Sequence, residues 1–101
     1  MSYRYIIIPL AQQDYEESVI WYQERSQQAA ENFVLAVEHT LKLICNNPQR
    51  WRKGYKDFQE LGIKKFPHSI IYKIETGNQT IVVTAIYHGK RNPKKRYRKI
   101  L

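Results

Sequence analysis

The sequence predicts an α+β fold in which a helical hairpin packs on one face of a mainly antiparallel sheet of three to four strands. The spacing of apolar residues carries this prediction. They recur every three or four positions between residues 11 and 45, which is the period of a helix, and every second position after residue 58, which is the period of a strand. A short β-branched run precedes the helical part, so the predicted element order is β-α-α-β-β-β.

The length and composition indicate one domain spanning residues 1–101, with 43% apolar content. The apolar run IIIPLA is far shorter than the roughly 20 residues of a membrane-spanning helix, and too short for a secretory signal. The single cysteine, Cys45, cannot form an internal disulfide and falls at an apolar helical position. We therefore expect a cytoplasmic protein with no membrane contact and with Cys45 in its core. The sequence predicts no metal site and no cofactor, since no Cys/His spacing fits zinc.

The first elements are a strand and a helix. The run YRYIIIP at residues 3–9 is rich in β-branched residues and is stopped by Pro9. The next segment is predicted to be helical because its apolar residues recur on one face. These residues are Ala11, Tyr15, Val19 and Tyr22.

A second helix follows a break near residues 25–28, where Ser26 is a suitable N-cap. Its apolar stripe runs over about four turns. The stripe consists of Ala30, Phe33, Val34, Val37, Leu41, Ile44 and Cys45. The sequence NNP at residues 46–48 is a strong stop. Two amphipathic helices with a short link predict an antiparallel hairpin.

The second half of the chain is predicted to be a loop followed by three strands. Residues 49–58 are polar and basic, as expected for a loop. Gly77 and Asn78 mark a hairpin turn, so the last two of these strands should be antiparallel neighbours. Pro67 separates the first of the three strands from the second. The strands are expected near residues 58–66, 69–76 and 80–88.

Positive charge is concentrated in the second half. The net charge is +8, with −2 in residues 1–50 and +10 in residues 51–101. Seven of the ten residues from 90 to 99 are Lys or Arg, within a basic tail at about residues 89–101. Such asymmetry is typical of proteins that bind phosphates or an acidic protein. Solubility alone is the simpler alternative.

The loop at residues 49–58 also alternates basic and aromatic side chains. They are Trp51, Arg52, Lys53, Tyr55 and Lys56. The rings of such a loop can stack on bases or on side chains of a partner. Alternatively, the loop is a hinge whose rings pack on the helices.

Three stretches of the chain resemble the RelE/ParE superfamily of type II toxin–antitoxin toxins, which includes plasmid stabilisation proteins. They are VIWYQERSQQAAENFVLAVEHTLKLICNNPQRW, IKKFPHSIIYKI and TIVVTAIYHGKRNP, and the resemblance covers about residues 3–97. It implies the helical hairpin and sheet predicted above. It also implies one of two mechanisms: cleavage of messenger RNA in the ribosomal A site, or growth inhibition by poisoning DNA gyrase without nuclease chemistry. Both kinds of toxin are neutralised by a small antitoxin.

The ribonuclease mechanism needs phosphate-binding cations and acid–base groups. By resemblance, Arg91 matches the arginine that the nuclease branch keeps after its last strand, and Tyr97 matches its functional tyrosine. Lys65 or Lys64 is a candidate partner, since alternation lets only one of them face a given side of a strand. His88 borders the basic segment and is a candidate acid–base group.

Other positions depart from the nuclease pattern. Ser69 stands where that branch has a second arginine, and Glu60 and Gly62 replace its lysine-rich strand. His68 is interpreted as a packing or hydrogen-bonding residue rather than a catalytic one.

The gyrase-directed branch fits the motifs slightly better and requires only a surface. In that interpretation no group needs a tuned pKa, and Trp21 and Tyr72 lie in the core. The predicted residues for target or nucleic-acid binding are Lys64, Lys90, Arg91, Lys94, Lys95 and Arg96. The expected partners are an acidic antitoxin, in a hetero-oligomer, and either DNA gyrase or the ribosome with its mRNA. A non-toxic basic nucleic-acid-binding module remains a third possibility.

Overall fold

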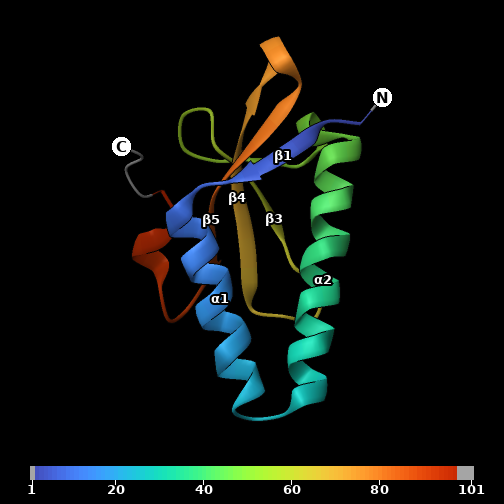
Figure 1. Cartoon of the computed structure of the whole chain (residues 1–101). Coiled ribbons are helices and arrows are strands. Elements are labelled where there is room, and N and C mark those ends of the chain that lie inside the picture. Colours follow the sequence, from blue (N-terminus) through green and yellow to red (C-terminus); the bar gives the residue numbers. More distant parts are fainter. Residues whose placement is uncertain (1, 98–101) are drawn as a thin grey trace.

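Two helices lie on one face of a five-stranded sheet in the computed structural model, which describes residues 2–97. The helices are α1 (Pro9–Gln23) and α2 (Gln27–Asn46), and they run side by side as a hairpin (Figure 1). The predicted α+β class, with a helical hairpin on a mainly antiparallel sheet, is confirmed.

The sheet has the strand order β1-β5-β4-β3-β2, in which β1 pairs with β5 in parallel and all other pairs are antiparallel. The strands are β1 (Arg4–Ile7), β2 (Arg52–Lys53), β3 (Gln59–Gly62), β4 (His68–Glu75) and β5 (Thr80–His88). Short 3-10 helices are η1 (Pro48–Arg50), η2 (Thr76–Asn78) and η3 (Pro93–Lys95). The sheet has one strand more than predicted, because β2 lies in the stretch expected to be a loop and pairs two residues with β3.

The ends of the helices follow the local chemistry of the sequence. Pro9 stops β1 and occupies the start of α1, where its missing N–H costs nothing and its fixed φ suits the helix. Ser26 caps α2 as predicted, since its Oγ accepts a hydrogen bond of 3.2 Å from the Ala29 N–H. Asn47 and Pro48 then end α2 and lead into η1.

The turns between strands are partly as predicted. β4 and β5 form the expected antiparallel hairpin through η2, and Gln79 completes the turn with a φ of 51°. The strand predicted near residues 58–66 was wrong in its second half, because β3 ends at Gly62. Residues 63–67 turn instead, with Lys65 at a φ of 72° and the Phe66 N–H bonded to the Ile63 carbonyl.

The buried residues form two clusters on opposite faces of the sheet. The first lies under the helices and consists of Ala11, Phe33, Val37, Leu41, Ile44, Cys45, Ile63, Ile70, Tyr72, Ile81, Val83 and Ile86. The second lies on the other face and consists of Phe58, Ile71, Ala85 and Tyr87, with Tyr97 packed against it. Cys45 and Tyr72 are therefore core residues as expected, and the Tyr72 hydroxyl donates to the Pro48 carbonyl at 2.7 Å.

A β-bulge in β5 decides which side chains reach each cluster. Ile71 pairs with Ala85 and Tyr72 pairs with Val83, so Thr84 has no partner of its own in β4. The extra residue shifts the alternation of the strand. As a result Ile86 continues on the helix face after Val83, and Ala85 enters the second cluster.

Within residues 2–97, no helix is both long enough and apolar enough to cross a membrane.

Candidate functional site

The turn after β5 presents Arg91, and His88 organises that turn. The Nδ1 atom of His88 accepts hydrogen bonds from the backbone N–H groups of Lys90 (3.1 Å) and Arg91 (3.0 Å), and its carbonyl accepts one from Asn92 (2.9 Å). Burial and the nearby Arg91 guanidinium lower the pKa of His88. His88 is thus held as a neutral acceptor, with Nδ1 engaged by the backbone.

Arg91 is held against a helix by an aromatic ring. Its guanidinium carbon lies 4.4 Å from the centre of the Trp21 ring on α1, and that of Arg25 lies 3.4 Å from the same ring. Trp21 was expected in the core; it is only partly buried and instead holds two guanidinium groups. The contact between Trp21 and Arg25 could have been predicted from the sequence, because the two residues are four positions apart on a helix. The contact between Trp21 and Arg91 could not, because it joins distant parts of the chain.

A polar pocket of about 160 Å³ opens beside Arg91. Its lining combines carboxylates with cations, and it comes from α1, the end of β5 and η3. The lining residues are Asp14, Glu17, Ser18, Trp21, Ile86, His88, Arg91, Asn92 and Lys95. Because carboxylates and cations line the same pocket, some of its cations are paired within the protein, as Lys95 is with Asp14 and Glu17.

Two of the predicted binding cations are neutralised within the fold. Lys95 Nζ lies 3.0 Å from Asp14 Oδ1 and 3.5 Å from Glu17 Oε1. Arg96 donates from Nε (3.0 Å) and Nη2 (2.6 Å) to Glu60 Oε1, a carboxylate that also accepts from Tyr87. The Glu60 hydrogen bond raises the pKa of Arg96. These two cations fasten the segment after β5 to the sheet and to α1.

The other predicted cations are exposed. Lys64, Lys90 and Arg91 lie in turns at one end of the sheet, whereas Lys94 lies in η3 beside the start of α1. The Gly89 N–H donates to the Pro67 carbonyl at 2.9 Å, so the turn before β4 meets the turn after β5. Lys64 and Lys65 lie in the first turn, so the strand alternation expected for them does not apply. Four of the six predicted cations have no carboxylate of residues 2–97 within ion-pair distance: Lys64, Lys90, Arg91 and Lys94. Arg98 and Lys99 of the predicted basic tail lie outside the described residues.

Tyr97 lies on the opposite face of the sheet from Arg91. Its ring centre is 5.3 Å from that of Phe58 in the second cluster and 5.7 Å from that of Tyr55. Its ring also covers Gly54 so closely that any side chain at position 54 would collide with it. Arg91 contacts Trp21 on the helix face, so the two residues do not converge on a common site.

Replacing Gly54 by alanine should displace the Tyr97 ring. A Cβ atom at this position would lie 3.0 Å from Tyr97 Cζ and still closer to the hydroxyl, so the ring must move. We expect a loss of about 1–2 kcal/mol in the free energy of unfolding, measured by urea denaturation, and loss of the NMR contact between Tyr97 and Phe58. Gly77→Ala is the matched control, because its Cβ would meet nothing within 4 Å. Equal effects of the two substitutions would contradict the packing described here.

His68 is a buried structural residue, as interpreted from the sequence. It is 1% exposed, and its Nε2 atom lies 3.2 Å from Ser18 Oγ. Burial, and then the neighbouring His88 and Arg91, lower its pKa to about 4. His68 is therefore neutral at physiological pH and packs beneath the Arg91 turn, with its ring centre 5.2 Å from that of His88.

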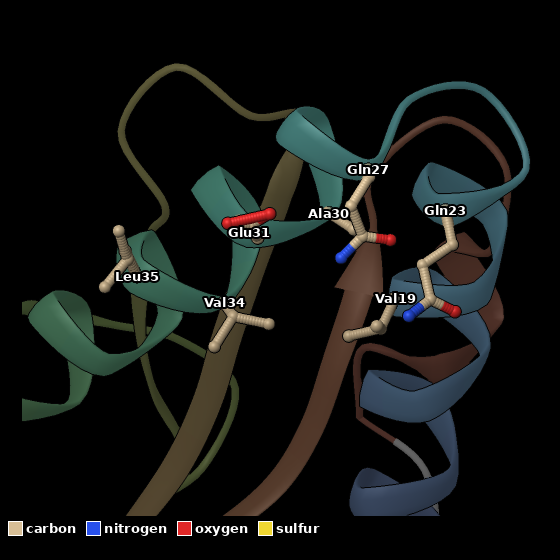
Figure 2. Close-up of a pocket in the computed structure, with 7 residues that line it drawn as sticks. All are labelled: Val19, Gln23, Gln27, Ala30, Glu31, Val34 and Leu35. Carbon is tan, nitrogen blue, oxygen red and sulfur yellow. The ribbon is translucent and has the colours of Figure 1, made fainter.

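An apolar groove of about 290 Å³ lies between the two helices (Figure 2). Val19 on α1 faces Ala30 and Val34 on α2, and Leu35 at the rim is 63% exposed. Gln23, Gln27 and Glu31 provide its polar edge. The groove shares no lining residue with the polar pocket beside Arg91. The sequence predicted an apolar groove between the hairpin and the edge of the sheet, whereas this groove lies between the two helices.

No group of three His, Cys, Asp or Glu side chains in the described part of the chain is arranged to hold a metal ion.

Comparison with known proteins identifies the family. The sequence profile of the "ParE toxin of type II toxin-antitoxin system, parDE" matches residues 5–93. The chain belongs to this ParE toxin family. Its fold is also similar to that of a double-arginine mutant of the E. coli toxin RelE in the free state, with a TM-score of 0.66 and 11% identity over 100% of both chains. A comparison with curated protein sequences gives no match. The ParE family match and the RelE-like fold confirm that the chain is a toxin of the RelE/ParE superfamily.

Proposed function

We propose that this ParE-family toxin inhibits growth by binding its target, without cleaving RNA. The separation of Arg91 from Tyr97 is the observation that supports this most strongly. Arg91 stacks on Trp21 on the helix face, whereas Tyr97 stacks on Phe58 on the other face. Cleavage of a phosphodiester requires a cation and a proton donor around one phosphate, within hydrogen-bond reach.

The state of the remaining candidate catalytic groups supports the same conclusion. His88 has Nδ1 engaged by two backbone N–H groups, and its lowered pKa disfavours the protonated form that a general acid needs. Lys65 lies exposed in the turn at residues 63–67, with its backbone in the left-handed region. A binding surface, in contrast, needs only exposed charge and shape, which the Arg91 end of the sheet offers.

The proposed target is DNA gyrase, as the resemblance to the gyrase-directed branch implies. The proposed cellular location of the toxin is the cytoplasm. The exposed cations Lys64, Lys90, Arg91 and Lys94 would form the contact surface, while Lys95 and Arg96 hold its supporting segment in place. Arg91 is pre-organised by Trp21, which lowers the entropy that it loses on binding.

The family implies an antitoxin as the partner of this chain. We propose that the antitoxin is acidic and partly disordered when free, because the second half of the toxin carries a net charge of +10. An apolar segment of the antitoxin would occupy the groove between α1 and α2 (Figure 2), and its acidic residues would reach the exposed cations. A short neighbouring open reading frame that encodes an acidic protein would support this assignment.

Regulated expression of three variants in bacteria tests the mechanism. Wild type should arrest growth with intact transcripts and inhibited supercoiling, and Arg91→Ala should raise the concentration for half inhibition of purified gyrase about tenfold or more. Tyr97→Phe keeps the ring and removes the hydroxyl, so it should remain toxic. Lys42→Ala, on the exposed face of α2, is the control for loss of a positive charge.

Transcript mapping gives the outcome that would overturn the proposal. Ribosome-dependent cleavage that is lost in both Arg91→Ala and Tyr97→Phe would assign a RelE-like endoribonuclease instead. Thermal melting of each variant excludes unfolding as the cause of lost toxicity.

A further inference from the structure

The segment at residues 50–56, which includes β2, carries the densest group of cations that form no ion pair within residues 2–97. Four of the seven residues from 50 to 56 are basic, and none is acidic. These four are Arg50, Arg52, Lys53 and Lys56; all are exposed, and no carboxylate of residues 2–97 lies within ion-pair distance of any of them. We call this set, together with Tyr55, the loop surface. It differs from the segment after β5, where Lys95 and Arg96 are already neutralised.

Tyr55 adds an exposed aromatic ring to these charges. It is 59% exposed, yet its ring is held 5.7 Å from that of Tyr97, which in turn lies 5.3 Å from buried Phe58. The three rings thus form a row that is anchored in the second cluster and ends in solvent. Lys56 Nζ lies 5.4 Å from the centre of the Tyr55 ring, so positive charge accompanies the exposed ring. The other aromatic of the loop, Trp51, packs on the core, and its indole N–H bonds to the Leu43 carbonyl.

A groove of about 320 Å³ adjoins the loop surface. Lys53 and Lys56 line it together with the apolar side chains of Phe58 and Ile74. The one carboxylate in its lining, Asp57, is paired with Lys73 at 3.6 Å, which offsets its charge. The volume lies at the lower end of the range for small-ligand sites, about 300–1,000 Å³. It is therefore of a size to hold a single nucleotide unit.

We propose that the loop surface is a binding site for single-stranded nucleic acid. Exposed rings flanked by lysine and arginine bind single strands because bases stack on the rings while the cations contact phosphates. In a duplex the base faces are already stacked on one another, so Tyr55 cannot reach them. The site uses the edge strand β2 and the loop that follows it, and it is independent of the Arg91 surface proposed for the toxic target.

The backbone at Lys56 allows a clean removal of charge. Lys56 has a φ of 53°, in the left-handed region that Asn adopts more readily than Lys. Lys56→Asn therefore removes the cation at a position where the new residue suits the backbone. Tyr55→Phe keeps a ring for stacking, and Tyr55→Ala removes it.

Fluorescence anisotropy of the purified full chain with labelled oligonucleotides tests the proposal. The probes are oligothymidylate and oligouridylate of twelve nucleotides and a DNA duplex of the same length. We expect the wild type to bind a single strand more tightly than the duplex. Tyr55→Ala should weaken single-strand binding about tenfold, whereas Tyr55→Phe should bind within about twofold of wild type. Tighter binding of the ribo or the deoxy probe would assign the natural strand as RNA or DNA.

The charge variants provide the second arm of the experiment. Lys56→Asn and Lys53→Gln should each reduce the slope of log affinity against log salt by about 0.7, the value for one phosphate contact on a single strand. Lys42→Gln on α2 should leave the slope unchanged. The proposal is overturned if Tyr55→Ala binds like wild type, or if the duplex binds as tightly as the single strands. Growth arrest and gyrase inhibition are measured separately, so failure here leaves the proposed toxic mechanism unaffected.

Discussion

Asp14→Ala is expected to lower the free energy of unfolding by about 3 kcal/mol. Asp14 is 3% exposed on α1, and it connects two later parts of the chain. Its Oδ2 atom accepts the buried N–H of Ile86 at 3.2 Å, and its Oδ1 atom lies 3.0 Å from Lys95 Nζ. Alanine removes both interactions and leaves the Ile86 N–H without its acceptor in the interior. Because Lys95 is 32% exposed and can turn to solvent, most of the loss should come from that N–H.

Two further variants separate the contributions at Asp14. Asp14→Asn keeps an oxygen for Ile86 and loses the charge, so it should cost about 1 kcal/mol. Glu17→Ala removes the other carboxylate near Lys95, but that side chain is 56% exposed, and its loss should cost less than about 1 kcal/mol. Urea denaturation followed by circular dichroism measures all three. If Asp14→Ala and Glu17→Ala were equally mild, the buried hydrogen bond would have no role in stability.

Stability should fall as the pH is lowered from 7 to 5, and His68 should account for most of the loss. The pKa of His68 is about 4 in the folded chain, against an ordinary value of 6.5. Between these two values the unfolded chain binds a proton that the folded chain does not, so acid favours unfolding. The expected loss is about 2 kcal/mol between pH 7 and pH 5, rising to about 3 kcal/mol near pH 4. The lowered pKa of His88 acts in the same direction.

The test compares the pH dependence of unfolding rather than stability at one pH. His68→Gln retains a group that can pair with Ser18 and removes the titration, so its stability should change little between pH 7 and pH 5. His39→Gln, on the exposed face of α2, should keep the full dependence of the wild type. An unchanged dependence in His68→Gln would show that another group is responsible.

The sequence was a good guide to elements that depend on local interactions. The helical period, the Ser26 cap and Pro9 predicted both helices and their ends, and the Gly77 turn predicted the hairpin. The two-residue strand β2 was missed because its pairing depends on β3 and not on its own residues. The bulge at Thr84 was missed for a related reason: a bulge is decided by the partner strand.

The site was less predictable because its contacts join residues far apart in the chain. The sequence indicated a basic segment after β5 but not which cations would remain free. Lys95 meets Asp14 and Arg96 meets Glu60 only once the sheet has formed. Glu60 was interpreted as a departure from a nuclease pattern; in the fold it fastens Arg96. Trp21 was placed in the core because it belongs to an apolar stripe of the helix. Such a stripe does not reveal which of its side chains will lie at the boundary with solvent, as Trp21 does.

The parallel pairing of β1 with β5 has a consequence for how the chain folds. Arg4 lies opposite Thr80, so the first strand finds its place only when the last strand is available. During synthesis the helical hairpin can form early from local contacts, whereas the sheet beneath it stays incomplete until about residue 83 has left the ribosome. We expect slow, late closure of the sheet, and a nascent chain whose helices expose their apolar face until the final strand arrives.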